Sequence, residues 1–151
     1  MTEKKRKHIF LSYCRDNKTE VARLRDELAK TGEQVWWDQD IEAGQDSKFE
    51  IREAMKNAYA VVLFLSKESA KRRMSGIYPE ALDAIDLHRE YAPGSIFVIP
   101  VRLSECEIPS IEIDGTRTLD RIQFVDLFPA PKYSEGLEKL LRAVRKAPYH
   151  P

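Results

Sequence analysis

The stretch Tyr59-Ala-Val-Val-Leu-Phe-Leu65 decides the fold, because it is apolar throughout and rich in β-branched and aromatic residues. A strand with one face in water alternates apolar and polar residues, and this stretch does not alternate. A continuous apolar run is typical of a strand that helices cover on both faces, as in a parallel sheet. The stretch therefore predicts a central strand between two helical layers.

The rest of the chain alternates between short apolar runs and helical periodicity. Further strands are predicted at 8–13, 33–38, 95–101 and 122–127, and helices at 18–31 and from Ser47, Pro79 and Ser134 onward. Ser47 with Glu50 forms the pattern of a capping box, and Ser134 is the expected cap of the last helix. The mixed stretch 102–121 receives no assignment.

Alternating strands and helices predict a flavodoxin-like three-layer α/β fold. We expect a five-stranded, mostly parallel sheet of order 2-1-3-4-5 with helices on both faces. The length of 151 residues fits one domain over 1–151, with a core at about 8–146 and frayed ends. In this order a crevice opens at the carboxyl ends of the first and third strands, so residues after Tyr13 and after Leu65 are expected to line it.

The charge balance, apolar runs and cysteine spacing limit the kinds of partner and the location that we expect. Lys plus Arg and Asp plus Glu both number 25, so the formal charge is zero and general attraction to nucleic acid or to an anionic membrane is not expected. The apolar run 60–65 is far too short to cross a bilayer, and no signal-peptide pattern follows the basic N-terminus. Cys14 and Cys106 lie far apart, and no metal-ligand spacing is present. We expect a cytoplasmic protein without a bound metal.

Missing or incomplete motifs argue against several known types of site. No glycine-rich dinucleotide fingerprint follows the first strand, and there is no P-loop. A phosphoacceptor receiver domain needs a carboxylate at the end of the third strand, where the chain has Leu65 and Ser66. The acids at 38, 40 and 42 are similar to the start of a calcium loop, but the glycine is displaced to Gly44 and Phe49 stands at the twelfth position.

The chain resembles the Toll/interleukin-1 receptor (TIR) domain family, specifically its free-standing bacterial, NAD-cleaving members. The matching segments, in family order, are Ile9 to Tyr13 with Arg15 and Asp16, Val35 to Asp38 with Ile41 to Gly44, Val62 to Ser66, Tyr78 to Glu80, Ile99 to Leu103, and Phe124 to Leu127. They extend over about His8 to Lys146, which is nearly the whole chain. Each segment is weak alone, and the ordered set is fairly specific.

The resemblance implies cleavage of the bond between nicotinamide and ribose, with NAD as a substrate and no cofactor. It implies that Glu80, early in the helix after the third strand, is catalytic, and that Cys14, Arg15 and Glu42 contact NAD. The family often has a tryptophan four residues before the glutamate, where this chain has Gly76, and Tyr78 stands nearer the acid. A fixed carboxylate suits this chemistry, because the departing nicotinamide leaves an oxocarbenium-like ribose.

Simpler structural interpretations remain open at this stage. Glu80 directly follows Pro79, and a negative charge there also complements the dipole of a helix N-terminus. Arg15 is also consistent with a solvated loop cation, and Cys14 with a small residue at a packed turn. The pattern leaves open whether Glu80 acts as an electrostatic stabiliser, an acceptor for a ribose hydroxyl or a nucleophile.

Two functions follow from the resemblance. The first is an NAD glycohydrolase or ADP-ribosyl cyclase that produces ADP-ribose or a cyclic isomer in bacterial immune signalling or antiphage defence, where a signal-receiving effector protein is a possible partner. The second is a non-catalytic adaptor that acts by homotypic association through the loop 38–46. The two can coexist, since relatives often build the active site between neighbouring subunits.

Overall fold

A computed structural model describes residues 6–72 and 79–151 of the chain. Its main sheet has five parallel strands in the order β2-β1-β3-β4-β7. The strands are β1 His8–Ser12, β2 Val35–Trp36, β3 Ala58–Leu65, β4 Val98–Arg102 and β7 Val125–Asp126. The predicted flavodoxin-like order 2-1-3-4-5 is confirmed, with β7 as the fifth strand.

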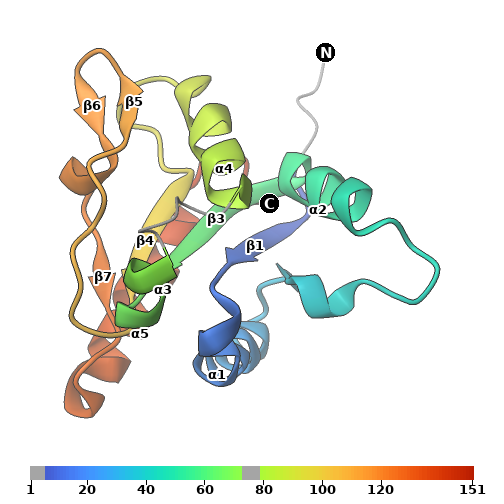
Figure 1. Ribbon diagram of the computed structural model, residues 1–151, viewed down its shortest axis with the longest axis horizontal. Helices are drawn as coiled ribbons and strands as arrows, with labels where there is room; N and C mark the ends of the chain where they lie inside the picture. The colour runs from blue at the N-terminus through green and yellow to red at the C-terminus, as the bar shows by residue number, and fades with distance from the viewer. Residues whose placement is uncertain (1–5, 73–78) are drawn as a thin grey trace.

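Helices cover both faces of this sheet (Figure 1). The helices are α1 Lys18–Lys30, α2 Ser47–Lys56, α3 Lys67–Arg72, α4 Pro79–Arg89 and α5 Tyr133–Arg145. The buried side chains of α1 and α5 belong to one cluster, and those of α2 and α4 belong to another on the opposite face. The short helix α3, which the sequence did not predict, follows β3 directly.

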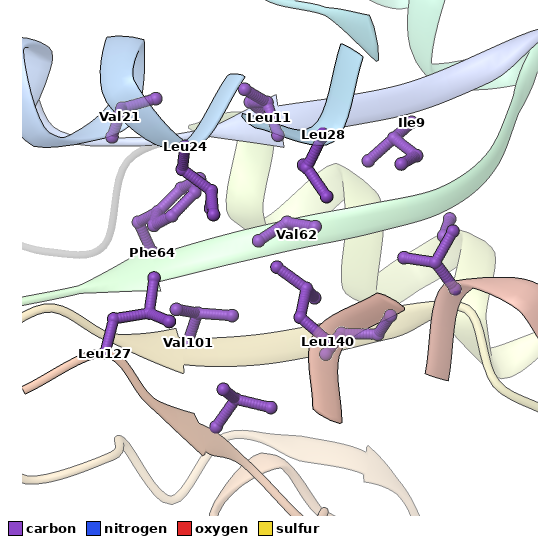
Figure 2. Close-up of a cluster of buried hydrophobic side chains, with 14 of the residues drawn as sticks. Ile9, Leu11, Val21, Leu24, Leu28, Val62, Phe64, Val101, Leu127 and Leu140 are labelled. Atoms are coloured by element: carbon purple, nitrogen blue, oxygen red, sulfur yellow. The ribbon is translucent and has the colours of Figure 1, made fainter. Parts of the chain in front are cut away.

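The two cores meet at β3, in which every residue is buried. Val62 and Phe64 point toward α1 and α5, where Figure 2 shows them between Leu24 and Leu140. Leu63 belongs to the opposite cluster, with the buried residues of α2 and α4. Each such side chain contributes about 1.5–3 kcal/mol through burial. The run that decides the fold therefore supplies apolar surface to both layers.

The start of α2 differs from the prediction by one residue. The N-cap is Asp46, whose Oδ1 accepts the backbone N–H of Phe49 at 3.0 Å, and Ser47 is already helical. The predicted capping box of Ser47 is therefore wrong, because an aspartate one position earlier fills the same role. Ser134 does not cap the last helix either, since α5 begins at Tyr133 without a side-chain cap.

The unassigned stretch 102–121 contains a small antiparallel hairpin of β5 Glu112–Asp114 and β6 Arg117–Thr118. Its turn is held by Asp114, whose Oδ1 accepts the backbone N–H groups of Thr116 and Arg117, both at 3.0 Å. Strands of two and three residues carry too few side chains to give a period. The hairpin lies beside α4 (Figure 1).

The C-terminal end is packed, in contrast to the expected fraying after residue 146. Ala147 is only 5% exposed, and the ring of Tyr149 meets that of Tyr91 edge to face. The Nε2 atom of His150 lies 2.7 Å from Glu33 Oε1. None of the helices in the described ranges has the length and apolarity needed to cross a membrane.

Candidate functional site

The carboxyl ends of β1, β2 and β3 are tied together by side chains. The hydroxyl of Tyr13 donates to Asp38 Oδ1, which links the end of β1 to the segment after β2. Burial, followed by this hydrogen bond, raises the pKa of the Tyr13 hydroxyl, so it keeps its proton and donates. The Ser66 hydroxyl, directly after β3, donates to Asn17 Oδ1 at 2.6 Å. The predicted edge is therefore a connected unit.

Glu80 lies in the first turn of α4 and is half-buried. Its side chain lines a groove of about 650 Å³ between α2 and α4. Apolar side chains line this groove as well, with Ile51 and Met55 from α2 and Leu87 from α4. A carboxylate at the end of a partly apolar groove is a suitable arrangement for a ligand with flat rings and a reactive centre.

The two walls of this α2–α4 groove carry opposite charges. Lys48, Arg52 and Lys56 recur at every fourth position of α2 and line one wall. The acidic residues that line the other wall are Glu80, Asp83 and Asp86 of α4 and Glu90, which directly follows that helix. Within the described ranges no ion pair joins the two helices across the groove. The α2 cations are therefore available to an anionic ligand.

The other predicted site residues stand at the same edge of the sheet on different segments. Cys14 is buried and precedes the short 3-10 helix Arg15–Asn17, while the Arg15 side chain is exposed. Glu42 is exposed on the loop after β2, where its backbone N–H donates to Gln45 Oε1 at 2.8 Å. Gly44 has a φ of 93° there, a conformation that favours glycine.

The structure does not bring the full predicted set into contact. Cys14 and Arg15 are neighbours on the exit of β1, but no contact in the described ranges joins them, or Glu42, to Glu80. Gly76 and Tyr78, which precede the glutamate where the family often has a tryptophan, lie outside the described residues.

Ser12 is a site candidate that sequence reasoning missed. It is 1% exposed at the end of β1, and its Oγ has no hydrogen-bond partner among the described residues. Strand alternation places Ser12 on the same face as Phe10, which packs in the layer of α2 and α4. The only signal in the sequence was a polar residue that closes an apolar strand.

A second group of polar side chains at this edge, centred on Arg102, has a structural role. Arg102 at the end of β4 donates from Nε and Nη2 to the two carboxylate oxygens of Asp126, at 2.7 and 2.9 Å. Its Nη1 also donates to the backbone oxygen of Cys106 at 2.9 Å, and its guanidinium lies over the ring of Phe124. The hydrogen bonds to Asp126 raise the pKa of Arg102 further, so the clamp stays charged and anchors the following loop.

In the described part of the chain, no group of three or more His, Cys, Asp and Glu residues is arranged to hold a metal ion. The edge instead combines a half-buried carboxylate, a row of cations and apolar surface. This combination can bind an anionic, partly aromatic ligand and stabilise a positive charge that develops near Glu80.

Comparisons with known proteins agree with this architecture. A sequence profile of the TIR domain family matches residues 9–141. A search of curated proteins finds no significant relative. Among solved structures, the chain is similar to the TIR domain of the Toll-related receptor TRR-2 from Hydra magnipapillata, with a TM-score of 0.67 and 16% identity over 91% of this chain and 97% of that one.

Two further structures are similar at comparable identity. The TIR domains of the activated Roq1 resistosome give a TM-score of 0.64 at 17% identity, over 90% of this chain and 98% of that chain. A metazoan TIR-STING receptor from C. gigas gives 0.59 at 18% identity over 97% of this chain. The present chain spans only 43% of the length of that receptor. At such identities the likeness shows the fold.

Proposed function

Because the chain belongs to the TIR domain family, we propose that it is an NAD nucleosidase that cleaves the bond between nicotinamide and ribose. The products are nicotinamide and either ADP-ribose or a cyclic isomer of it. The observation that carries the proposal is the position of Glu80, half-buried in the first turn of α4 at the α2–α4 groove. Cys14, Arg15 and Glu42 are the proposed further contacts of NAD at the same edge.

The chemistry requires one well-placed negative charge. The bond between ribose C1′ and the pyridinium nitrogen breaks, and its electron pair leaves with nicotinamide, which becomes neutral. The ribose is left as an oxocarbenium-like cation, which the Glu80 carboxylate stabilises. Water then adds its oxygen to C1′ and releases a proton, which gives ADP-ribose; attack by a nucleophile within the same molecule gives a cyclic isomer instead. No general acid is needed for a leaving group that departs neutral.

The α2 wall supports this assignment through its charge. NAD carries a diphosphate between its two nucleosides, and Lys48, Arg52 and Lys56 present cations along the groove that Glu80 also lines. Charge-assisted bonds from such side chains to phosphate oxygens are among the stronger polar contacts in proteins. The apolar side chains of Ile51 and Leu87 offer surface to a base or to the nicotinamide ring.

Incubation of the purified chain with NAD, at low and at high protein concentration, tests the proposal. We expect nicotinamide to appear in proportion to the NAD consumed, together with ADP-ribose or with a product lighter than ADP-ribose by one water. The high concentration is included because relatives often complete the site between subunits. NAD that stays intact at high concentration, while the chain self-associates, would contradict the enzymatic function.

That contradicting result would favour the second candidate, a TIR adaptor that acts by association with other copies. The supporting observation is the loop 38–46, most of which is exposed and which extends away from the body of the molecule (Figure 1). Directly after this loop, the side chain of Phe49 is 54% exposed on α2. Exposed aromatic side chains beside a projecting loop are common in protein interfaces.

In either case we place the chain in immune signalling. The structures that it resembles include an activated resistosome that recognises a pathogen effector and a TIR-STING receptor. We propose a cytoplasmic site of action and a signal-receiving effector protein as the partner in a bacterial antiphage pathway. Deletion of the coding sequence from a bacterial host that carries it, followed by phage challenge, tests this assignment through the change in plaque formation.

A further inference from the structure

A separate cavity opens at the amino-terminal end of β4, beside its outer edge. Apolar residues predicted a fifth strand over 122–127, but β7 has only two residues and pairs only with the end of β4. Ile122 and Gln123 therefore pass the edge of β4 outside the ladder. Together with Val98 and Ile99 they line a cavity of about 320 Å³.

His88 on α4 provides the central polar group of this β4-edge cavity. The ring is 4% exposed, and its Nδ1 accepts the backbone N–H of Val98 at 3.1 Å. A neutral imidazole that accepts at Nδ1 carries its proton on Nε2. The residues that the structure describes offer no acceptor to this Nε2–H, and His88 lines the cavity. The ring therefore has one donor left for a ligand.

Arg117 adds a fixed positive charge to the same cavity. Its Nε donates to Asp114 Oδ2 at 2.7 Å, and the turn of the hairpin holds Asp114 through backbone N–H groups. Burial, followed by the charge of Arg117, lowers the pKa of His88 to about 4, and the charge of Asp114 opposes this shift. The ring is therefore neutral at pH 7.

We propose that the β4-edge cavity binds a small organic carboxylate, which the Nε2–H of His88 and the guanidinium of Arg117 hold by its oxygens. The side chains of Ile96, Ile99 and Ile122 line the space for its apolar body. The hydroxyl of Ser95 and the amide of Gln123 are further polar groups in the lining. A cavity at the small end of the range for ligand sites suits a molecule much smaller than a dinucleotide.

This site is distinct from the α2–α4 groove. His88 follows Glu80 by eight residues on the same helix, which corresponds to about 12 Å along its axis. Glu80 stands at the carboxyl end of the strands and His88 beside the amino end of β4. The two cavities share no lining residue. The carboxylate site therefore does not depend on whether NAD is cleaved.

Titration of the 15N-labelled full chain with benzoate at pH 7 tests the proposal, with benzamide as its neutral match. We expect saturable shifts of the Val98 amide with benzoate, and binding of benzamide at least fivefold weaker. Arg117→Gln is expected to weaken benzoate at least fivefold and to leave benzamide unchanged. His88→Asn keeps an acceptor for the Val98 N–H, but its shorter amide no longer places a donor where Nε2 stands, and it is expected to weaken both compounds.

Glu80→Gln is the control variant, because it alters the other site and should leave benzoate binding unchanged. The proposal is overturned if benzoate gives no saturable shift, if benzamide binds as well as benzoate, or if Arg117→Gln has no effect. Where Arg117→Gln does not fold, the comparison of benzoate with benzamide on the unaltered chain decides the question. None of these outcomes depends on NAD turnover, so failure here is distinguishable from failure of the proposed activity.

Discussion

The hydroxyl of Ser66 donates to Oδ1 of Asn17 at 2.6 Å, and both residues are buried at the carboxyl edge of the sheet. The same Ser66 Oγ accepts the backbone N–H of Ser69 at 3.0 Å, while Ser69 Oγ accepts the backbone N–H of Ser66 at 2.8 Å. The position that a receiver domain would fill with a carboxylate thus holds a serine that joins the exits of β1 and β3.

Ser66→Ala is expected to lower the free energy of unfolding by about 1–3 kcal/mol, because it leaves Asn17 Oδ1 and the N–H of Ser69 buried without partners. Urea unfolding followed by circular dichroism measures the change. Ser110→Ala, at an exposed serine, is the matched control and should change the free energy by less than about 0.5 kcal/mol. Equal stability of the two variants would contradict the structural role of this hydrogen bond.

Gly136 on α5 marks a close approach between helix and sheet. A Cβ at this position would lie 2.3 Å from the backbone oxygen of Asp126 and 2.9 Å from Leu127 Cδ2. Gly136→Ala should therefore lower the free energy of unfolding by about 1–3 kcal/mol, even though alanine favours helices by about 1 kcal/mol. In thermal and urea unfolding, Gly115→Ala serves as control, since nothing lies near its added Cβ. A stabilised Gly136→Ala would refute the close approach.

His88 predicts a pH dependence of stability. Its pKa is about 4 in the folded chain, whereas the ordinary pKa of a histidine, which an unfolded chain retains, is 6.5. Between these values the unfolded chain binds more protons, so the stabilisation present above pH 6.5 is lost as the pH falls toward 4, by at most about 1.4 kcal/mol per pH unit. The lowered pKa of His8 acts in the same direction. The contribution of His88 is therefore isolated by the variant His88→Asn.

Urea unfolding of both proteins between about pH 7.5 and about pH 4.5 measures this contribution, because this range of about three units covers most of the interval between the two pKa values. We expect the excess stability of the unaltered chain over His88→Asn to shrink as the pH falls. Asp114, whose pKa is lowered to about 2, loses its contribution only at still lower pH. Parallel curves over the whole range would show that His88 is not held in its neutral form.

Substitution of Arg52 tests whether the cations of α2 bind the diphosphate of NAD. If its guanidinium contacts the diphosphate, Arg52→Gln should raise KM for NAD about three- to tenfold with kcat changed by less than about twofold, since a tenfold effect corresponds to about 1.4 kcal/mol. The rise should diminish at high salt, which screens the exposed cation. Lys30→Gln, at the exposed end of α1, is the control. An unchanged KM would remove the α2 cations from the NAD site.

Strong local patterns explain how much of the fold could be predicted. The continuous apolar run at 59–65 is enough by itself to predict a central strand. The sheet order follows from the alternation of strands and helices along the chain. The hairpin 112–118 could not be predicted, because its pairing depends on Asp114 and on contacts with α4 rather than on a period. The cap of α2 was displaced from Ser47 to Asp46, since two adjacent residues both suit that role.

The candidate site was only partly accessible from the sequence. A resemblance to relatives indicates Glu80, and the topology predicts a crevice at the strand ends. The residues that line the groove with Glu80 could not be predicted. The cations of α2 and the carboxylate of Glu80 lie on two helices that β3 separates in the sequence, and only the fold brings these helices together. His88 and Arg117 line one cavity because of a hairpin that had no sequence signal.

The most direct test of the central claim is the initial rate of nicotinamide release from NAD by Glu80→Gln, measured beside the unaltered chain and Glu90→Gln. Glutamine keeps the size of Glu80 and removes its charge, and Glu90 lines the same groove on the same side. We expect Glu80→Gln to lower kcat at least about 100-fold, which is typical for the loss of a group that stabilises transition-state charge, and Glu90→Gln to lower it less than about threefold. A rate for Glu80→Gln within threefold of the unaltered chain would contradict the account.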